Sequence, residues 1–163
     1  MNTAISSSNL LHLLQQNETP ALITAQGHRL SFLELYDRIG HFAGGLTQQG
    51  VKKGDRVVLL IPMSIDLYIA LLGLLWIGAT VVLIDPSAPV DKIVNRFELK
   101  GFIGSSRAHL LRLRHASLRG LDVYVSTGFT PLWHRRMSAL NSPPPPIAAA
   151  EYPALLTLSL IHI

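Results

Sequence analysis

The stretch GVKKGDRVVLLIPMSIDLYIALLGLLWIGATVVLIDPSAP, residues 50–89, decides the fold of this chain. Residues 56–61 are apolar and rich in β-branched side chains, which predicts a buried strand after a polar turn. Residues 80–84 predict a second buried strand. A helix joins the two, and such a connection requires the strands to run parallel with a right-handed crossover. This stretch therefore predicts a βαβ unit buried on both faces of its sheet.

Local signals set the limits of the helix between these strands. The Ser64 hydroxyl can accept a hydrogen bond from a free N–H group of the first turn, and Asp66 suits the positive end of the helix dipole. The helix is expected to continue to Trp76 or Ile77. Gly78 can then end it in the left-handed conformation.

The same stretch admits one alternative, a membrane span over residues 67–84. These 18 residues carry no charge, which is close to the roughly 20 that a membrane helix needs. However, Gly78 and Ala79 interrupt the run, and its composition changes there from leucine-rich to the strand-like Thr-Val-Val-Leu-Ile. The alternative function is a small membrane-associated binding protein, in which residues 107–119 lie on anionic lipid.

The glycine, proline and aspartate residues at the turns of this stretch resemble those of the adenylate-forming superfamily. The family turn G-[VL]-x-x-G-D-R-V corresponds to residues 50–57, and Pro62, Gly78-Ala79 and Asp85-Pro86 follow at similar spacing. Acyl-CoA synthetases, adenylation domains of peptide synthetases and luciferases belong to this superfamily. Ile77 departs from the pattern, because the family usually has Lys or Arg there.

Composition limits the other classes of protein. The chain has 163 residues, of which 48% are hydrophobic and 15% charged, as suits a core part of a larger α/β enzyme or a membrane-associated protein. The net charge of +4 comes without a recognisable nucleic-acid-binding module. There is no cysteine for a disulfide or a thiolate metal site. The N-terminus lacks the pattern of a secretory signal, so a cytoplasmic location is expected by default.

The segments before residue 50 predict a leading helix, a hairpin and a second helix. Residues 8–16 predict a short amphipathic helix, and residues 21–30 predict a small hairpin. Ser31 and Glu34 form a capping box at the start of the second helix. The glycines Gly40, Gly44 and Gly45 weaken that helix, so close packing against the sheet is expected. They lie inside a helix, which argues against a phosphate-binding loop.

The segments after residue 89 continue the alternation of strands and helices. Helices are predicted at 90–100 and 107–117, and strands at 101–104 and 121–125. This alternation is typical of an open, mainly parallel sheet. Residues 102–110, FIGSSRAHL, are similar to an F-I-G-x-x-K-A-H-L element of the olefin-biosynthesis branch of the superfamily, whose members are described as β-lactone synthetases.

A basic cluster falls on the predicted helix 107–117 and just beyond it. It comprises Arg107, His109, Arg112, Arg114, His115 and Arg119. One interpretation is a solvated helix face above the leucines at 110, 111, 113 and 118. The other is a surface for acidic head groups, CoA phosphates or an acidic partner. The histidines lack metal-site spacing, and the chain has neither G-x-S-x-G nor G-x-G-x-x-G, which argues against a simple serine hydrolase and a standard Rossmann dehydrogenase.

The last segments decide which chemistry is expected. Residues 142–146 form a polyproline connector, interpreted as a spacer rather than an SH3-type ligand. Residues 151–159 resemble the strand that leads into the family's glycine-rich ATP loop. Ser159 takes the place of the first Thr, and Leu-Ile-His-Ile at 160–163 replaces the loop. Such a loop needs small residues, because its backbone N–H groups must approach the phosphates.

The prediction is therefore an α/β chain that forms the partial N-terminal region of an adenylate-forming enzyme. Residues 1–141 form the N-terminal α/β part of the AMP-binding domain, 142–150 the Pro-rich connector, and 151–163 the truncated start of the ATP-loop strand. No catalytic, cofactor-binding or metal-binding residue is predicted in this chain, and the chain itself is expected to be inactive. An α/β interaction module without chemistry is the weaker third hypothesis.

The resemblance also implies the substrates of the complete enzyme. That enzyme would use ATP and Mg²⁺ to activate a carboxylic acid, expected to be fatty, as an acyl-adenylate. Thioester or β-lactone formation would follow, with CoA or a carrier protein as partner of the thioester reaction.

Overall fold

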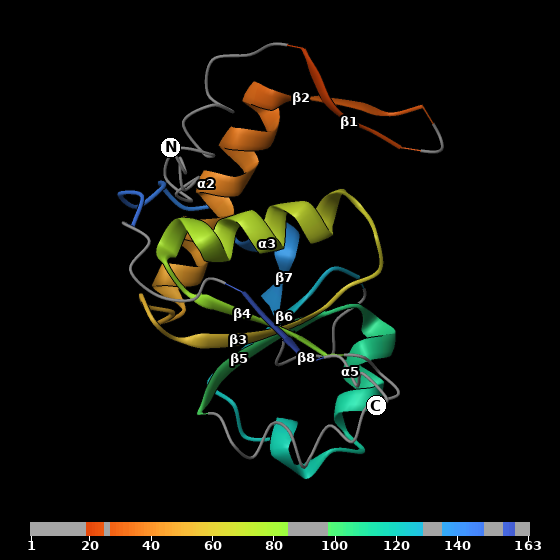
Figure 1. Cartoon of the computed structure of the whole chain (residues 1–163), viewed down its shortest axis with the longest axis vertical. Coiled ribbons are helices and arrows are strands. Elements are labelled where there is room, and N and C mark those ends of the chain that lie inside the picture. The colour runs from red at the N-terminus through yellow and green to blue at the C-terminus, as the bar shows by residue number, and fades with distance from the viewer. Residues whose placement is uncertain (1–18, 25–26, 85–97, 129–134, 149–154, 159–163) are drawn as a thin grey trace, which may run out of the picture.

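The computed structural model describes residues 19–24, 27–84, 98–128, 135–148 and 155–158. Its centre is a parallel sheet of six strands in the order β7-β6-β5-β3-β4-β8, with helices on both faces (Figure 1). The strands are β3 (Arg56–Leu60), β4 (Thr80–Ile84), β5 (Leu99–Gly104), β6 (Val123–Ser126), β7 (Arg135–Arg136) and β8 (Leu155–Leu158). The prediction of an open parallel sheet is confirmed.

The central βαβ unit has the predicted form. Helix α3 (Ile65–Ile77) joins β3 to β4, which pair in parallel with Val57 opposite Val81. The Ser64 hydroxyl accepts a hydrogen bond from the Leu67 N–H at 3.3 Å, and Gly78 ends the helix at φ 80°. The uncharged run 67–84 is thus divided between a helix and a buried strand. In the described ranges, no helix is long and apolar enough to cross a membrane.

The hairpin and the capped helix before this unit are also confirmed. Strands β1 (Pro20–Ile23) and β2 (Arg29–Ser31) pair antiparallel and lead into helix α2 (Phe32–Gln48). The Ser31 hydroxyl accepts a bond from the Glu34 N–H at 3.2 Å, and the Glu34 carboxylate accepts one from the Ser31 N–H at 2.9 Å. These bonds to the carboxylate lower the pKa of Glu34.

Each face of the sheet has its own hydrophobic core. Helices α2 and α3 cover one face, and their apolar side chains pack on those of β3 to β6. The opposite face is covered by helix α5 (Ser106–Arg112) and the 3₁₀ turn η1 (Ala116–Leu118) (Figure 1). Val57 and Val58, adjacent in β3, belong to different cores, as expected for a strand that is buried on both sides.

The Pro-rich segment packs along α2 and α3. The Ser142 N–H donates to the His41 carbonyl at 3.2 Å, and the Trp76 indole N–H donates to the Pro145 carbonyl at 2.7 Å. The backbone of this segment also approaches Gly44 closely: a Cβ added there would lie 2.5 Å from the Ser142 carbonyl oxygen. The close packing predicted for the glycines of α2 is therefore present. The predicted partner was wrong, because Gly40 and Gly44 face the Pro-rich segment and Gly45 faces Leu140 just before it, rather than the sheet.

Other element boundaries differ from the predictions. The helix expected at 90–100 is wrong at its end, since Leu99 and Lys100 already belong to β5, and its residues 90–97 lie outside the described part. The helix expected at 107–117 ends at Arg112, and η1 follows as a separate turn. The 3₁₀ turn η2 (Met137–Ala139) lies between β7 and the Pro-rich segment. The helix expected at 8–16 and the altered loop at 159–163 lie outside the described residues.

Candidate functional site

An open cavity of about 570 Å³ lies at the carboxyl end of β6, on the side of the sheet covered by α2 and α3. We call it the carboxyl-edge cavity. It is built from four parts of the chain: α2, the start of α3, the residues after β6, and the segment from β7 to residue 141. Its lining comprises Asp37, Arg38, His41, Phe42, Asp66, Ile69, Ser126, Thr127, Gly128, Arg136, Met137, Ser138, Leu140 and Asn141.

Hydrogen bonds fix parts of this lining. Ser126 is fully buried, and its hydroxyl oxygen accepts a hydrogen bond from the Gly128 N–H at 3.3 Å. The His41 ring Nδ1 lies 3.1 Å from the Ser142 carbonyl oxygen, which ties α2 to the Pro-rich segment beside the cavity. Ser126 and Thr127 directly follow the strand that the sequence predicts at 121–125. Only the structure shows that they line a cavity.

Charged groups and apolar groups share this lining. Asp66 is half-buried at the start of α3, and burial raises the pKa of its carboxyl while the charge of Arg38 opposes that rise. Phe42 and Ile69 are buried and contribute an apolar wall. The arrangement can bind a small molecule that has an apolar body and a polar group. It was missed in the sequence because its residues come from segments far apart in the chain.

A second position on the same edge of the sheet is closed. The connection after β3 runs toward β4 while the connection after β5 runs toward β6, so the strand order switches direction between β3 and β5. Open α/β sheets often bind ligands at such a switch point. Here the Ser105 N–H donates to the Leu60 carbonyl at 3.2 Å and joins the ends of the two strands. The open space therefore lies farther along the edge, at β6.

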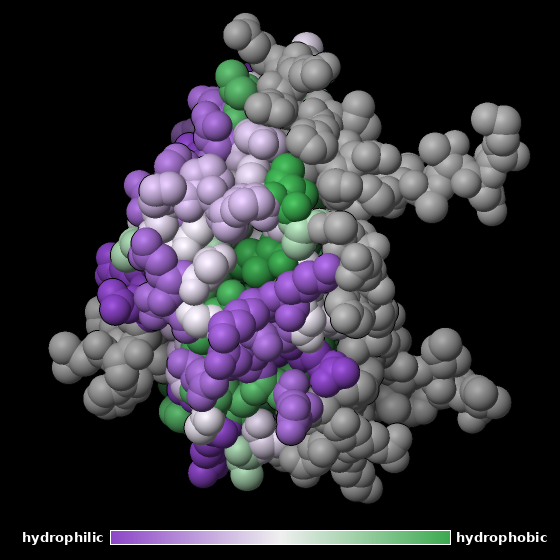
Figure 2. Space-filling model, turned by 90° about the vertical axis from the view of Figure 1, so that its left-hand side faces the viewer, coloured by the Kyte–Doolittle hydropathy of each residue, from purple (hydrophilic) through white to green (hydrophobic). Residues whose placement is uncertain are grey.

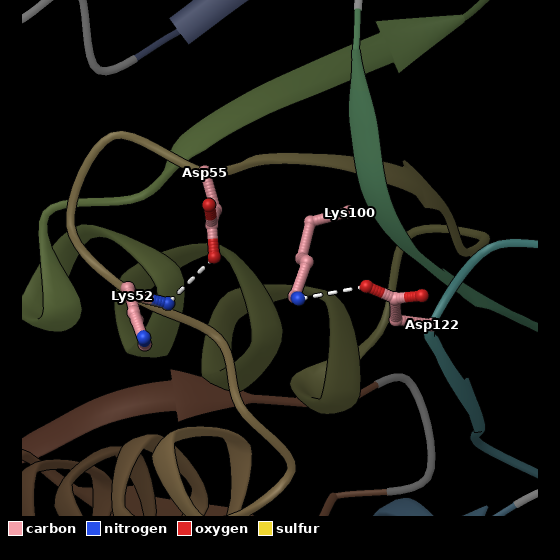
Figure 3. A network of polar contacts seen from close by, with 4 residues as sticks. All are labelled: Lys52, Asp55, Lys100 and Asp122. Carbon is pink, nitrogen blue, oxygen red and sulfur yellow. Dashed lines mark hydrogen bonds and ion pairs between the residues drawn. The ribbon is translucent and has the colours of Figure 1, made fainter.

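The opposite edge, where the strands begin, carries structural polar contacts. Figure 2 faces this side, and its surface is mainly hydrophilic with smaller hydrophobic patches. The Lys52 N–H donates to the Asp55 carboxylate at 2.8 Å, and the Lys100 ammonium lies 2.7 Å from the Asp122 carboxylate (Figure 3). The bond to Asp122 raises the pKa of Lys100. These pairs hold the turn before β3 and the approach to β6, a structural role.

Helix α5 divides the predicted basic cluster. His109 and Arg112 are buried, 4% and 7% exposed, whereas Leu110 and Leu113 are 67% and 53% exposed. The interpretation of a solvated basic face above buried leucines is therefore wrong for these four positions. Of the leucines expected beneath, Leu118 is buried.

Specific contacts explain the inward position of the two polar side chains. The His109 ring Nε2 lies 2.9 Å from the Val125 carbonyl oxygen, and the ring meets Phe102 edge to face with centroids 5.1 Å apart. The Arg112 guanidinium lies 4.1 Å from the centroid of the Tyr124 ring. Arg107, Arg114 and Arg119 are exposed, as the solvated-face interpretation expected of them.

That no residue of this chain binds ATP phosphates or Mg²⁺ stays a prediction. Strand β8 pairs with β4, and the position of the ATP loop follows it at residues 159–163, outside the described part. The bulky side chains at 160–163 do not fit a phosphate cradle. Across the part of the chain that the structure describes, no group of three His, Cys, Asp or Glu side chains is placed to hold a metal ion.

Comparison with known proteins identifies the family. Residues 12–117, more than half of the chain, match the family described as AMP-binding enzyme. The chain belongs to this family of adenylate-forming enzymes, and the predicted resemblance to acid–CoA ligases is confirmed. ATP, with Mg²⁺, is the usual cofactor of the family.

Curated relatives share parts of this chain. An acetyl-coenzyme A synthetase from Pseudoalteromonas translucida (strain TAC 125) is 34% identical over 92 residues, which are 54% of this chain and 14% of that protein. A syringomycin synthase from Pseudomonas syringae pv. syringae is 36% identical over 100 residues, 60% of this chain and 16% of that protein. The chain thus spans a small part of the curated relatives it matches.

Solved structures share the fold. A long-chain-fatty-acid-CoA ligase from Archaeoglobus fulgidus superposes with a TM-score of 0.79 at 21% identity, covering 98% of this chain and 35% of that one. An anthranilate CoA ligase in complex with anthranoyl-AMP gives 0.75 at 19% identity, covering 88% and 29%. The predicted α/β fold of an adenylate-forming enzyme is confirmed.

Proposed function

We propose that this chain is the N-terminal frame of an ATP-dependent ligase that activates a fatty acid as its acyl-adenylate. The observation that carries the proposal is the match of residues 12–117 to the AMP-binding enzyme family. The fatty substrate rests on the resemblance of residues 102–110 to the olefin-biosynthesis branch, and a long-chain-fatty-acid-CoA ligase is among the proteins that share the fold. The same resemblance supports β-lactone formation as an alternative to thioester formation in the second step.

The frame has a defined task in such an enzyme. Adenylation converts a carboxylate into an acyl phosphate anhydride, whose leaving group is AMP, and preorganised charge must stabilise the phosphates. The six-stranded sheet holds β8 rigidly beside β4, in register from Val81 opposite Leu155 to Ile84 opposite Leu158. Strand β8, parallel to β4, therefore ends at the carboxyl edge of the sheet. ATP, Mg²⁺, the acid and CoA or a carrier would be bound by parts of the enzyme outside those that this structure describes.

The chain alone is proposed to be inactive, and its location is proposed to be cytoplasmic. The sequence after Ser159 lacks the small residues of a phosphate loop, and the described part of the chain offers no metal-binding cluster. The carboxyl-edge cavity offers groups that can bind a small molecule, but the sequence after Ser159 offers none that would hold phosphates. This supports a structural rather than a catalytic contribution of the chain to the active site of the complete enzyme.

Acid-dependent ATP–pyrophosphate exchange tests both parts of the proposal. The 163-residue chain and the full reading frame of its gene would be purified and assayed with acetate, benzoate, octanoate and palmitate. We expect no exchange from the 163-residue chain. We expect exchange from the protein encoded by the full reading frame, fastest with palmitate or octanoate. Exchange by the chain alone would overturn its assignment as an inactive frame. The assignment as a fatty-acid ligase would be overturned if the full reading frame encoded no glycine-rich loop, or if its protein preferred acetate or benzoate.

A further inference from the structure

The outer face of α5 combines exposed leucines with arginines. Leu110 and Leu113 lie one turn apart, and the helical turn extends past α5 through the Leu113 N–H, which donates to the Leu110 carbonyl at 3.2 Å. Arg107 precedes Leu110 by three positions, so these two share one side of the helix, and the exposed Leu113 and Arg114 follow in the turn that continues it. The Arg119 guanidinium donates a hydrogen bond to the Leu113 carbonyl and completes the cluster. We call these five residues the α5 outer stripe.

The orientation of this helix is fixed from the inside. His109 contacts the Val125 carbonyl, and the Arg112 guanidinium lies over the Tyr124 ring, both on β6. Ala108 and Leu118 add an apolar contact to the core beneath. A rotation of α5 that buried Leu110 and Leu113 would expose His109 and Arg112 and break their contacts with β6. The leucines are therefore held at the surface, where neighbouring large apolar side chains can contribute to a binding surface.

The charge around the leucines is of one sign. Residues 105–121 contain four arginines, two histidines and no Asp or Glu. The nearest acid in sequence, Asp122, lies against the Lys100 ammonium. Three of the arginines, Arg107, Arg114 and Arg119, are exposed. In Figure 1, α5 lies on the side of the sheet opposite α2 and α3, so the stripe faces away from the larger of the two cores.

We infer that the α5 outer stripe is a peripheral membrane contact, in which the leucines enter the head-group boundary of an anionic bilayer and the arginines bind lipid phosphates. Basic residues beside large apolar ones on one helical face are the pattern of a helix that lies in the membrane interface. Arginine side chains can extend to the head groups while their methylene stems cover apolar surface. This contact is independent of the proposed ligase activity. It also differs from the predicted span, since α3 and β4 stay in the fold.

The size of the patch favours lipid over a protein partner. A stable protein interface buries about 800 Å² on each side, with apolar anchors seated in pockets. The α5 outer stripe offers two leucines on a short helix that projects from the sheet. A fluid lipid surface adapts to such a projection, and its negative charge complements the arginines.

Vesicle sedimentation of the 163-residue chain tests this inference. The vesicles would be pure phosphatidylcholine, or phosphatidylcholine with 30% phosphatidylserine, at low and at physiological salt. One variant is Arg107→Gln/Arg114→Gln, with Arg29→Gln/Lys52→Gln as the matched charge control. The other is Leu110→Gln/Leu113→Gln, with Ile23→Gln/Met63→Gln, equally exposed apolar residues elsewhere, as its control.

We expect binding to the anionic vesicles only, and weaker binding at higher salt. Each arginine should contribute about fivefold, so the double arginine variant should bind roughly 25-fold more weakly. The leucine variant should lose roughly tenfold. Both control variants should bind like the parent chain. Equal binding to neutral vesicles, no binding, or an equal loss in the controls would overturn the inference.

A label placed in this cysteine-free chain distinguishes lipid from protein as the partner. An environment-sensitive dye on Ala116→Cys, beside the stripe, should shift to the blue with anionic vesicles, whereas the same dye on Ser138→Cys should not. Binding to polyglutamate without any binding to vesicles would assign the stripe to an acidic protein and overturn the membrane contact.

Discussion

Substituting Gly44 by Ala tests the docking of the Pro-rich segment on α2. Helix propensity alone predicts that this substitution stabilises the protein by about 1 kcal/mol. The added Cβ, however, would lie 2.5 Å from the Ser142 carbonyl oxygen, whereas ordinary contact begins near 3.4 Å. The Pro143 carbonyl oxygen would lie closer still, so the segment would have to move by about 1.1 Å, because both obstacles are backbone and not a flexible side chain.

The cost of that movement follows from the contacts it disturbs. Four hydrogen bonds among the described residues hold the segment: Ser142 N–H to the His41 carbonyl at 3.2 Å, the His41 ring Nδ1 with the Ser142 carbonyl at 3.1 Å, Trp76 indole to the Pro145 carbonyl at 2.7 Å, and Ala148 N–H to the Trp76 carbonyl at 2.9 Å. Each contributes about 1 kcal/mol. Weakening most of them, less the gain in helix propensity, gives a net loss of about 2 kcal/mol. For a chain of this size that corresponds to a fall in Tm of about 4–8 °C.

Urea unfolding followed by far-UV circular dichroism measures this change. Gln48→Ala, at an exposed position of the same helix, is the control and should stay within about 0.5 kcal/mol of the parent. A Gly44→Ala protein that is more stable than the parent would refute the packing argument, because propensity alone would then account for the position.

Other predictions concern single groups. Trp76→Phe removes the donor to the Pro145 carbonyl and should lower the free energy of unfolding by about 1 kcal/mol; an unchanged urea midpoint would contradict it. Ser31→Ala removes the cap of α2 and should lower the free energy of unfolding by about 1 kcal/mol, with a weaker helical circular dichroism signal because α2 frays. An unchanged signal would show that the cap is dispensable. The folded-state pKa of Asp66 is raised above 3.8, so its proton stabilises the folded state at low pH and that contribution is lost as the pH rises through the folded pKa. Asp66→Asn should therefore lose less stability than the parent between pH 4 and pH 7, and parallel pH curves would show that burial does not perturb this carboxyl.

The parts of the fold that short sequence signals determine were predictable. The capping box of Ser31 and Glu34, the Ser64 cap and the left-handed Gly78 each act within a few residues, so their geometry is written in the local sequence. Alternation of apolar strands and helices was sufficient for the parallel sheet. The family could be recognised from the spacing of turn residues in the βαβ unit.

The parts that depend on distant contacts were not predictable. Leucine and arginine on α5 were assigned to the inside and the outside by hydrophobicity, but Tyr124 and the Val125 carbonyl reverse that assignment for Arg112 and His109. The carboxyl-edge cavity combines α2, α3 and the residues after β6, so no local pattern marks it. The glycines of α2 indicated close packing, but the sequence does not show which segment packs against them.

Strand β8 has a consequence for the order in which the sheet forms. It pairs with β4 alone, and Val81 and Leu155 are separated by roughly seventy residues of chain. The pairs β3–β4 and β3–β5 connect segments much closer in sequence. During synthesis on the ribosome, the inner strands can therefore assemble and bury their valines well before β8 emerges. Until then β4 has an open edge, a point at which nascent chains are exposed to mispairing and to chaperones.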